Sequence, residues 1–175
     1  MILVNLFGSP GTGKSTGAAY IFSQLKMRGV NAELVTEFAK DKVWEGSKAV
    51  FENQAYIFGK QYFRISRCAD KLDVVITDSP LLLSLVYNTN PVLGEDFNNV
   101  VRKVVDSYDC ANYFLVRTKA YNPVGRFQTE EESDKIADRI RELLDYEKID
   151  YTVTTGDING YNVIVDQIME LLKGA

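Results

Sequence analysis

Residues 8–15 constrain the fold of this chain more than any other part of its sequence. They read Gly-Ser-Pro-Gly-Thr-Gly-Lys-Ser, which matches the pattern G-x-x-x-x-G-K-[S/T] at every fixed position. A continuous apolar run, residues 2–7, precedes this segment, and a helical stretch over residues 14–27 follows it. Since the pattern is meaningful only between a strand and a helix, the context agrees with the motif. It therefore predicts an α/β fold organised around a strand, a glycine-rich loop and a helix.

The residue types of this loop suit a bound polyphosphate. Glycines let the backbone N–H groups curl around phosphate oxygens, and the N-terminus of the following helix adds partial positive charge. Lys14 is expected to reach the β- and γ-phosphates, and the Ser15 hydroxyl to coordinate magnesium. We therefore expect ATP and Mg²⁺ at the loop, whose members are Gly8, Ser9, Pro10, Gly11, Thr12, Gly13, Lys14, Ser15 and Thr16. The loop does not identify the phosphate acceptor, because GTPases and motor ATPases share it.

The rest of the chain alternates short apolar strands with longer helices. Strands are expected at residues 32–36, 74–77, 113–116 and 151–154, and helices at 48–69, 97–107, 158–172 and after Thr129. Thr129 and Glu132 have the spacing of a capping box at the start of that helix. Short apolar strands separated by helices predict a parallel sheet covered on both faces. We therefore predict one α/β domain over residues 1–175, a P-loop NTPase fold with a five-stranded parallel sheet in a kinase-like strand order.

Composition restricts the classes of partner and of chemistry. The net charge of −4 and the pI of about 5.0 argue against a protein that coats nucleic acid with positive charge. No stretch approaches the ~20 apolar residues of a membrane span, and the N-terminal run is interpreted as a strand and not a signal peptide. Cys68 and Cys110 lack metal-ligand spacing, which is typical of free thiols in the cytoplasm. Because histidine is absent, acid–base chemistry must fall to Asp or Glu.

Two carboxylates follow predicted strands at the edge where open α/β sheets bind their ligands. Asp78 follows residues 73–77 and is placed to hold magnesium or to lie beside the acceptor, although Asp before Ser-Pro is also an ordinary helix cap. Glu37 follows the second strand and is placed to accept the proton of an attacking hydroxyl. A Glu in the first turn of a helix is also favoured by the helix dipole alone. The sequence leaves open which of the two is the base.

Two further side chains are candidates for substrate contacts. Gln54 lies on a largely apolar, aromatic helix face, where its amide needs a partner, either a nucleobase edge or the protein's own backbone. Residues 117–129 form a lid-like segment in which Arg126, beside Gly125, is expected to close over the γ-phosphate as an arginine finger. Arg139 and Arg141 on the next helix are interpreted as part of a solvated face.

Taken together, these features resemble the layout of deoxynucleoside kinases. The resemblance is carried by the phosphate loop, by Glu37 with Trp44 beyond it, by Gln54, and by Asp78-Ser79-Pro80. It implies that Glu37 is the base and that Trp44 and Gln54 contact a nucleobase. The stretch Thr36-Glu37-Phe38-Ala39-Lys40 also resembles ribosylnicotinamide kinase domains and related AAA-like phage kinases.

The chain departs from deoxynucleoside kinases at two places. Those kinases carry an Arg between the acidic residue and the Ser after the third strand, whereas Ser79 here follows Asp78 directly. Their lid is rich in Arg, whereas this one offers only Arg117, Lys119 and Arg126. The departures leave the acceptor undefined.

The predicted enzyme is a P-loop kinase that moves the γ-phosphoryl group of ATP to a hydroxyl of a nucleoside or nucleotide-like small molecule. The expected catalytic residues are Lys14, Glu37, Asp78 and Arg126, the substrate-binding residues Phe38, Trp44 and Gln54, and the magnesium ligands Ser15 and Asp78. One alternative is a kinase acting on a nucleotide or modified base in DNA, which a basic rim at Lys40, Lys42, Lys60, Arg64 and Arg67 would favour. A regulatory P-loop ATPase is the second alternative. The sequence is compatible with a homodimer.

Overall fold

The centre of the fold is a five-stranded parallel sheet with the strand order β2-β3-β1-β4-β5. The computed structural model describes residues 1–124 and 129–174. The strands are β1 (Ile2–Phe7), β2 (Ala32–Val35), β3 (Val74–Thr77), β4 (Asp109–Val116) and β5 (Thr152–Thr155). Because β1 lies in the middle, the loop after it emerges at the centre of the carboxyl edge of the sheet. The predicted P-loop fold with a five-stranded parallel sheet is confirmed.

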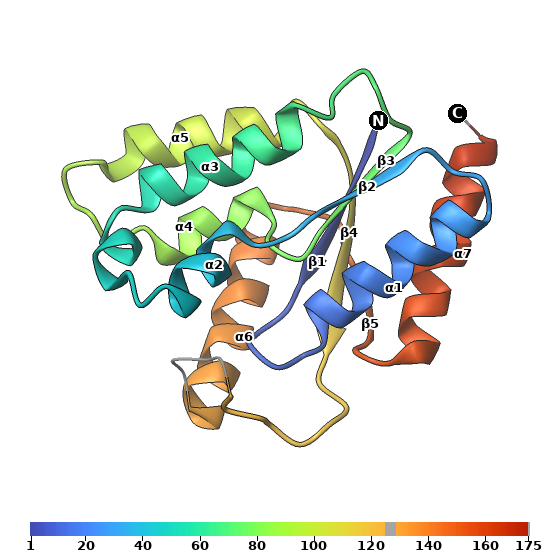
Figure 1. Ribbon diagram of the computed structural model, residues 1–175. Helices are drawn as coiled ribbons and strands as arrows, with labels where there is room; N and C mark the ends of the chain where they lie inside the picture. Colours follow the sequence, from blue (N-terminus) through green and yellow to red (C-terminus); the bar gives the residue numbers. More distant parts are fainter. Residues whose placement is uncertain (125–128, 175) are drawn as a thin grey trace.

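Helices cover both faces of the sheet, as Figure 1 shows. One face packs against α1 (Lys14–Met27) and α7 (Ile158–Lys173), and the other against α3 (Gln54–Ser66), α5 (Gly94–Val105) and α6 (Glu130–Tyr146). Shorter elements follow β2 and β3: α2 (Phe38–Trp44), η1 (Lys48–Glu52), η2 (Leu81–Leu83) and α4 (Ser84–Tyr87). None of the helices in the described ranges is both long and apolar enough to cross a bilayer.

Alternation along the fully buried β1 divides the core between the two faces. Ile2, Val4 and Leu6 pack against α1 and α7. On the other face Leu3 belongs to a cluster under α3 and α5, and Phe7 belongs to a separate cluster under α6. Asn5 lies between Leu3 and Phe7 on that second face, so β1 carries a polar side chain at the point where its two clusters divide.

Element boundaries agree with the sequence where a local signal defines them. The capping box forms as predicted: the Glu132 N–H donates to Thr129 Oγ1, and the Thr129 N–H donates to the Glu132 carboxylate. The helix predicted over residues 48–69 is wrong in its first part, because residues 48–52 form a short 3-10 helix. The α-helix begins only after Asn53, whose side chain accepts the Tyr56 N–H. Strand β4 begins four residues earlier than predicted, at Asp109.

Candidate functional site

The loop between β1 and α1 has the backbone geometry that its glycines permit. Gly13 is the N-cap of α1 with φ at 91°, and a Cβ there would lie 2.4 Å from the Tyr161 hydroxyl oxygen. The Lys14 ammonium donates to the carbonyls of Gly8 and Ser9 at 2.7 and 2.9 Å, which folds this side chain back over the loop. Ser15 is exposed in the first turn of α1. The residues present therefore fit a bound triphosphate with its magnesium.

Two side chains from distant helices hold the loop in place. Ser133 of α6, fully buried, donates its hydroxyl to the Pro10 carbonyl at 2.8 Å. The Tyr161 hydroxyl of α7 lies 3.0 Å from the Gly13 carbonyl oxygen and 2.9 Å from that of Gly156. Neither residue was predicted from the sequence. Only their positions on the buried faces of α6 and α7 mark them, and this signal does not distinguish a loop contact from ordinary packing.

A clamp joins the ends of β2 and β3 and positions Glu37. The Glu37 N–H donates to Asp78 Oδ1 at 2.9 Å, and the next N–H, of Phe38, donates to Gln61 Oε1 at 3.0 Å. Gln61 in turn donates its amide to the Thr77 hydroxyl at 3.1 Å. Asp78 and Gln61 are 3% and 4% exposed, so water competes little for these bonds. The structure brings Glu37 and Asp78 together because β2 and β3, which they follow, are neighbouring parallel strands.

Gln61 was not recognised as a site residue in the sequence. It lies seven residues after Gln54, hence on the same face of α3, and both amides are buried. A second glutamine at that spacing was the available signal. The sequence alone does not show which of these two glutamines lies beside the end of β3.

Burial controls the ionisation of Glu37. Desolvation raises the pKa of its carboxyl above the ordinary value, the nearby Lys14 ammonium lowers it in part, and the Asp78 carboxylate raises it further. Lys14, Glu37 and Asp78 are therefore close enough to interact electrostatically. A carboxylate with a raised pKa is a stronger base than an exposed one, which is the property a general base needs.

The partner of Gln54 is a side chain that was not predicted from the sequence. Its Nε2 donates to the Ser84 hydroxyl at 3.1 Å, from α3 to α4, and Gln54 is 7% exposed. The partner is therefore a side chain and not the protein's own backbone. A buried amide beside a hydroxyl forms a polar pair in an otherwise apolar region.

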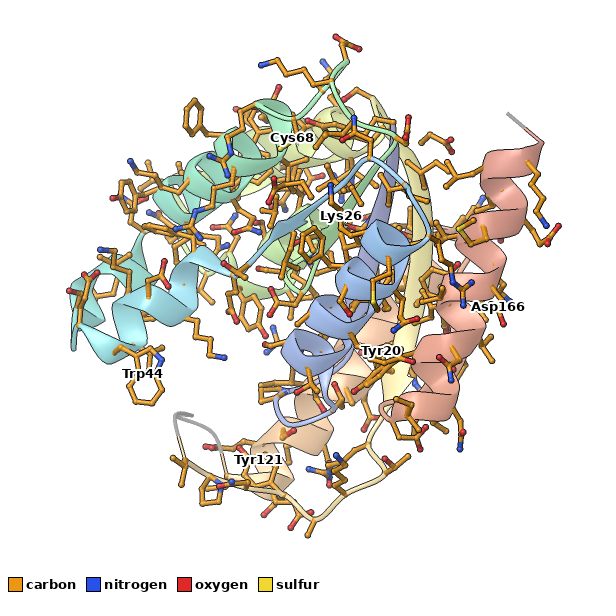
Figure 2. All side chains as sticks on the ribbon, turned by 45° about the vertical axis from the view of Figure 1, so that its right-hand side comes forward. Tyr20, Lys26, Trp44, Cys68, Tyr121 and Asp166 are labelled. Atoms are coloured by element: carbon orange, nitrogen blue, oxygen red, sulfur yellow. The ribbon has the colours of Figure 1, made fainter. Side chains whose placement is uncertain are left out.

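The two aromatic candidates differ in accessibility. The Phe38 ring is buried, with Lys42 Nζ 5.5 Å and the Arg64 guanidinium 5.2 Å from its centroid, and with Tyr56 packed edge-on. Trp44 is 70% exposed at the end of α2, and Figure 2 shows its ring standing clear of the neighbouring helices. Of the two, only Trp44 therefore presents a free ring face.

Tyr87 and Arg139 extend the site beyond the predicted residues. Arg139 of α6 is exposed, as interpreted from the sequence, and it also donates Nη2 to the Val86 carbonyl of α4 at 2.7 Å. Although the Tyr87 side chain is 40% exposed, partial desolvation and the Glu37 charge raise the pKa of its hydroxyl to about 12, against the effect of Arg139. Tyr87 is therefore close enough to both Glu37 and Arg139 to interact with them electrostatically.

The lid-like segment is described as far as Val124 and again from Thr129. Arg126, the expected arginine finger, lies outside the described residues. Arg117 at the start of the segment pairs with Glu130 at 3.4 Å and with Asp134, both on α6, and its guanidinium lies 5.4 Å from the Tyr121 ring centroid. These contacts join the first part of the segment to α6.

Charges on the proposed basic rim are partly neutralised. Lys42 pairs with Glu45 at 2.5 Å, and Arg64 pairs with Asp41 at 2.9 Å. Across residues 1–124 and 129–174, no group of three or more His, Cys, Asp or Glu side chains is arranged to hold a metal ion. Magnesium bound with a triphosphate needs only one or two protein ligands, so Ser15 and Asp78 stay predicted ligands.

Comparison with known proteins gives a family and a fold. A solved structure of deoxyadenosine kinase from M. mycoides with bound dATP is similar to this chain, with a TM-score of 0.59 and 19% identity over 98% of this chain and 99% of that one. At this identity the likeness concerns the fold alone. No curated protein matches the chain. A family model described as an AAA domain matches residues 3–160. The chain therefore belongs to this AAA domain family, and its fold is that of a P-loop, nucleoside-kinase-like protein.

Proposed function

We propose that the protein transfers the γ-phosphoryl group of ATP to a hydroxyl of a nucleoside or nucleotide-like small molecule. One observation carries the proposal: Glu37 has a partly buried carboxyl, its backbone N–H is held by Asp78, and it interacts electrostatically with the loop lysine, Lys14. A protein that only binds and senses ATP has no chemical step that needs a base, whereas one that hydrolyses ATP would direct the same group at water. A kinase needs such a base to accept the acceptor's proton.

The reaction balances with the residues in these roles. The acceptor oxygen forms a bond to the γ-phosphorus while the bond from that phosphorus to the β–γ bridging oxygen breaks, and the electron pair leaves with ADP. Glu37 takes the hydroxyl proton. Lys14 moves from the Gly8 and Ser9 carbonyls to the phosphate oxygens, where its charge opposes the developing negative charge. Magnesium held by Ser15, with Asp78 nearby, supplies further neutralisation of the phosphates when bound.

Asp78 has a positioning role in this scheme. Its Oδ1 accepts the Glu37 N–H, so that this oxygen helps to hold the backbone of the base in place, and the Asp78 carboxylate would also help to hold magnesium. We therefore assign the role of base to Glu37 and not to Asp78. The raised pKa of Glu37 supports the same assignment.

The acceptor is proposed to bind among α2, α3 and α4. Gln54 and Ser84 together offer a donor and an acceptor of hydrogen bonds, which matches the edge of a nucleobase. Trp44 supplies an exposed ring for stacking. Tyr87 and Arg139 lie toward the Glu37 side, where the ribose or deoxyribose hydroxyls would be placed. Such an arrangement of side chains would favour a compact acceptor with a base and a sugar.

A phosphate-transfer screen tests the proposal. ATP labelled on the γ-phosphate is incubated with the protein and, separately, with nucleosides, nucleotides, nicotinamide riboside and single- and double-stranded DNA, with Glu37→Gln as the matched inactive control. Transfer to a free nucleoside or nucleotide that disappears in Glu37→Gln supports the proposal. Transfer only to DNA supports the DNA-kinase alternative. ATP hydrolysis without any acceptor, equal in both proteins, contradicts kinase function and supports a regulatory ATPase.

A further inference from the structure

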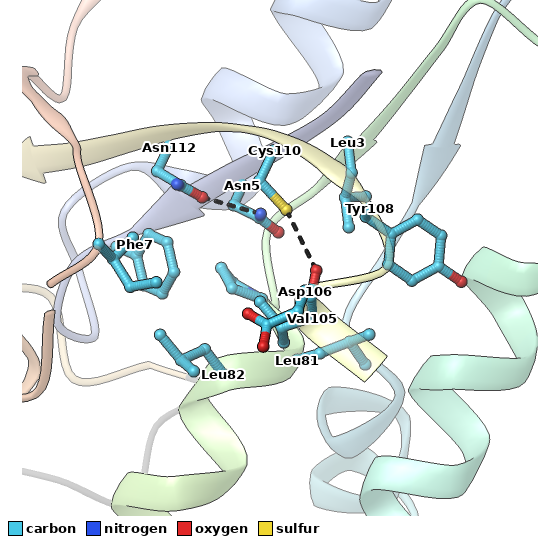
Figure 3. Close-up of a pocket in the computed structure, with 12 residues that line it drawn as sticks. Leu3, Asn5, Phe7, Leu81, Leu82, Val105, Asp106, Tyr108, Cys110 and Asn112 are labelled. Atoms are coloured by element: carbon cyan, nitrogen blue, oxygen red, sulfur yellow. Dashed lines mark hydrogen bonds between the residues drawn. The ribbon is translucent and has the colours of Figure 1, made fainter. Parts of the chain in front are cut away.

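A cavity lies apart from the phosphate loop. It encloses about 260 Å³ between the sheet and the segment from Pro80 to Leu82, where the two core clusters of that face divide (Figure 3). Leu3 and Phe7 of β1 and Leu81 and Leu82 of η2 supply apolar walls. Its described lining includes no residue of the phosphate loop. The cavity is therefore a separate site and not an extension of the ATP site.

Asn5 gives this cavity a polar feature. The side chain is 5% exposed in the middle of a buried strand, and its Nδ2 donates to Asn112 Oδ1 at 3.0 Å. Its own Oδ1 is buried and accepts no hydrogen bond from any residue that the structure describes. Figure 3 shows this amide directed toward the cavity, beside Cys110. An amide oxygen left unpaired in the core costs stability, so a donor that entered the cavity and reached it would be favoured.

The charges around the cavity define what it accepts. Its lining contains no Lys or Arg and includes the carboxylate of Asp106, so phosphates and other anions are disfavoured. Burial raises the pKa of the Cys110 thiol to about 11, so the thiol stays protonated and neutral near pH 7. The remaining surface is largely apolar. In another protein an apolar cavity of ~150 Å³ holds a benzene molecule, so this volume is sufficient for one ring.

We propose that this cavity is a ligand site for a small neutral molecule that has one apolar ring and one O–H or N–H, which donates to Asn5 Oδ1. The ring packs among Leu3, Phe7, Leu81 and Leu82, and the donor satisfies the amide oxygen. The inference does not depend on the proposed kinase activity. Its test is therefore a binding measurement and not an activity assay.

Phenol and toluene form a suitable probe pair, because they share size and shape and only phenol donates a hydrogen bond. Binding of each is measured by calorimetry to the full chain and to Asn5→Leu, which keeps the side-chain volume and removes the acceptor. We expect saturable phenol binding to the wild type. We also expect the ratio of phenol to toluene affinity to fall at least about ten-fold in Asn5→Leu, because ten-fold corresponds to the ~1.4 kcal/mol of one hydrogen bond. An unchanged ratio overturns the proposal.

A cavity-filling variant tests independently whether phenol binds in this cavity. It also provides the test if Asn5→Leu does not fold. Cys110→Met extends a side chain that lines the cavity, so phenol binding should be lost while ATP binding stays at the wild-type level. Phenol binding of equal strength in Cys110→Met, or no phenol binding to the wild type, overturns the proposal. ATP binding serves as the folding control for both variants.

Discussion

Glu37→Gln is the most informative single change in this protein. It keeps the side-chain size and the backbone N–H bond to Asp78 Oδ1, and it removes the charge and the basicity. If Glu37 takes the acceptor's proton, phosphoryl transfer should fall by about 10²- to 10⁴-fold, the usual contribution of a general base. ATP affinity should be unchanged or slightly tighter, because a negative charge near Lys14 and the triphosphate is lost. Steady-state kinetics with ATP and the acceptor varied separately measures both.

The pH dependence of the rate follows from the direction in which burial moves the pKa of Glu37. Burial raises this pKa above 4.5, and only the deprotonated carboxylate accepts a proton. The wild-type rate should therefore fall as the pH drops through the raised pKa, at a higher pH than for an exposed glutamate. Glu37→Gln should lack this acid limb. Its residual rate should vary little over the same range.

The raised pKa also predicts a stability difference of known sign. Because the folded-state pKa of Glu37 is raised, the fold favours the protonated carboxyl, and stability decreases as pH rises from the unfolded-state pKa through the folded-state pKa. Above that range the wild type retains the penalty of a partly desolvated charge, and raising a pKa by one corresponds to about 1.4 kcal/mol. Glu37→Gln should thus melt at a higher temperature than the wild type at pH 8. The difference should disappear below pH ~4, where both side chains are neutral.

Glu142→Gln on the exposed face of α6 is the matched control, since the same chemical change there should alter neither rate nor melting temperature appreciably. Transfer by Glu37→Gln within a few-fold of wild type would exclude Glu37 as the base. An acid limb that persists in the variant would assign it to another group. A lower melting temperature than wild type at pH 8 would contradict the argument from burial.

Four other variants test separate parts of the site. Lys14→Ala should lower transfer by about 10²-fold or more with little change in melting temperature, and near-normal turnover of the folded variant would refute the role of the loop. Gln61→Leu should leave the Phe38 N–H without its acceptor, costing about 1–3 kcal/mol in chemical denaturation and lowering kcat more than it alters the KM for ATP. Tyr161→Phe should raise the KM for ATP several-fold, because the loop loses its hydrogen bond to α7. If only the melting temperature changes, Tyr161 stabilises the fold and does not position the loop for ATP. Gln54→Ala should raise the KM of the acceptor more than that of ATP, and the reverse pattern would move Gln54 to the ATP side.

Features that depend on neighbouring residues could be predicted from the chain alone. The phosphate loop is defined by its own glycines, Lys14 and Ser15, and the capping box by Thr129 and Glu132, because backbone conformation and spacing within one turn specify both. Short apolar strands between helices were likewise sufficient to predict a parallel sheet. The expectation that Glu37 and Asp78 lie at the ligand-binding edge of the sheet followed from a general rule, that open α/β sheets bind their ligands at the carboxyl ends of their strands.

The side chains that support these local features are selected by packing in three dimensions. Gln54 meets Ser84 across 30 residues, Ser133 meets Pro10 across 123, and Tyr161 meets Gly13 across 148. No pattern along the chain encodes such pairs, because a hydrogen bond of about 3 Å depends on how whole helices pack on the sheet. The unpaired oxygen of Asn5 also depends on tertiary packing. Asn5 is buried because its strand lies in the centre of the sheet. Its oxygen accepts no hydrogen bond from a described residue because it lies where the two core clusters divide.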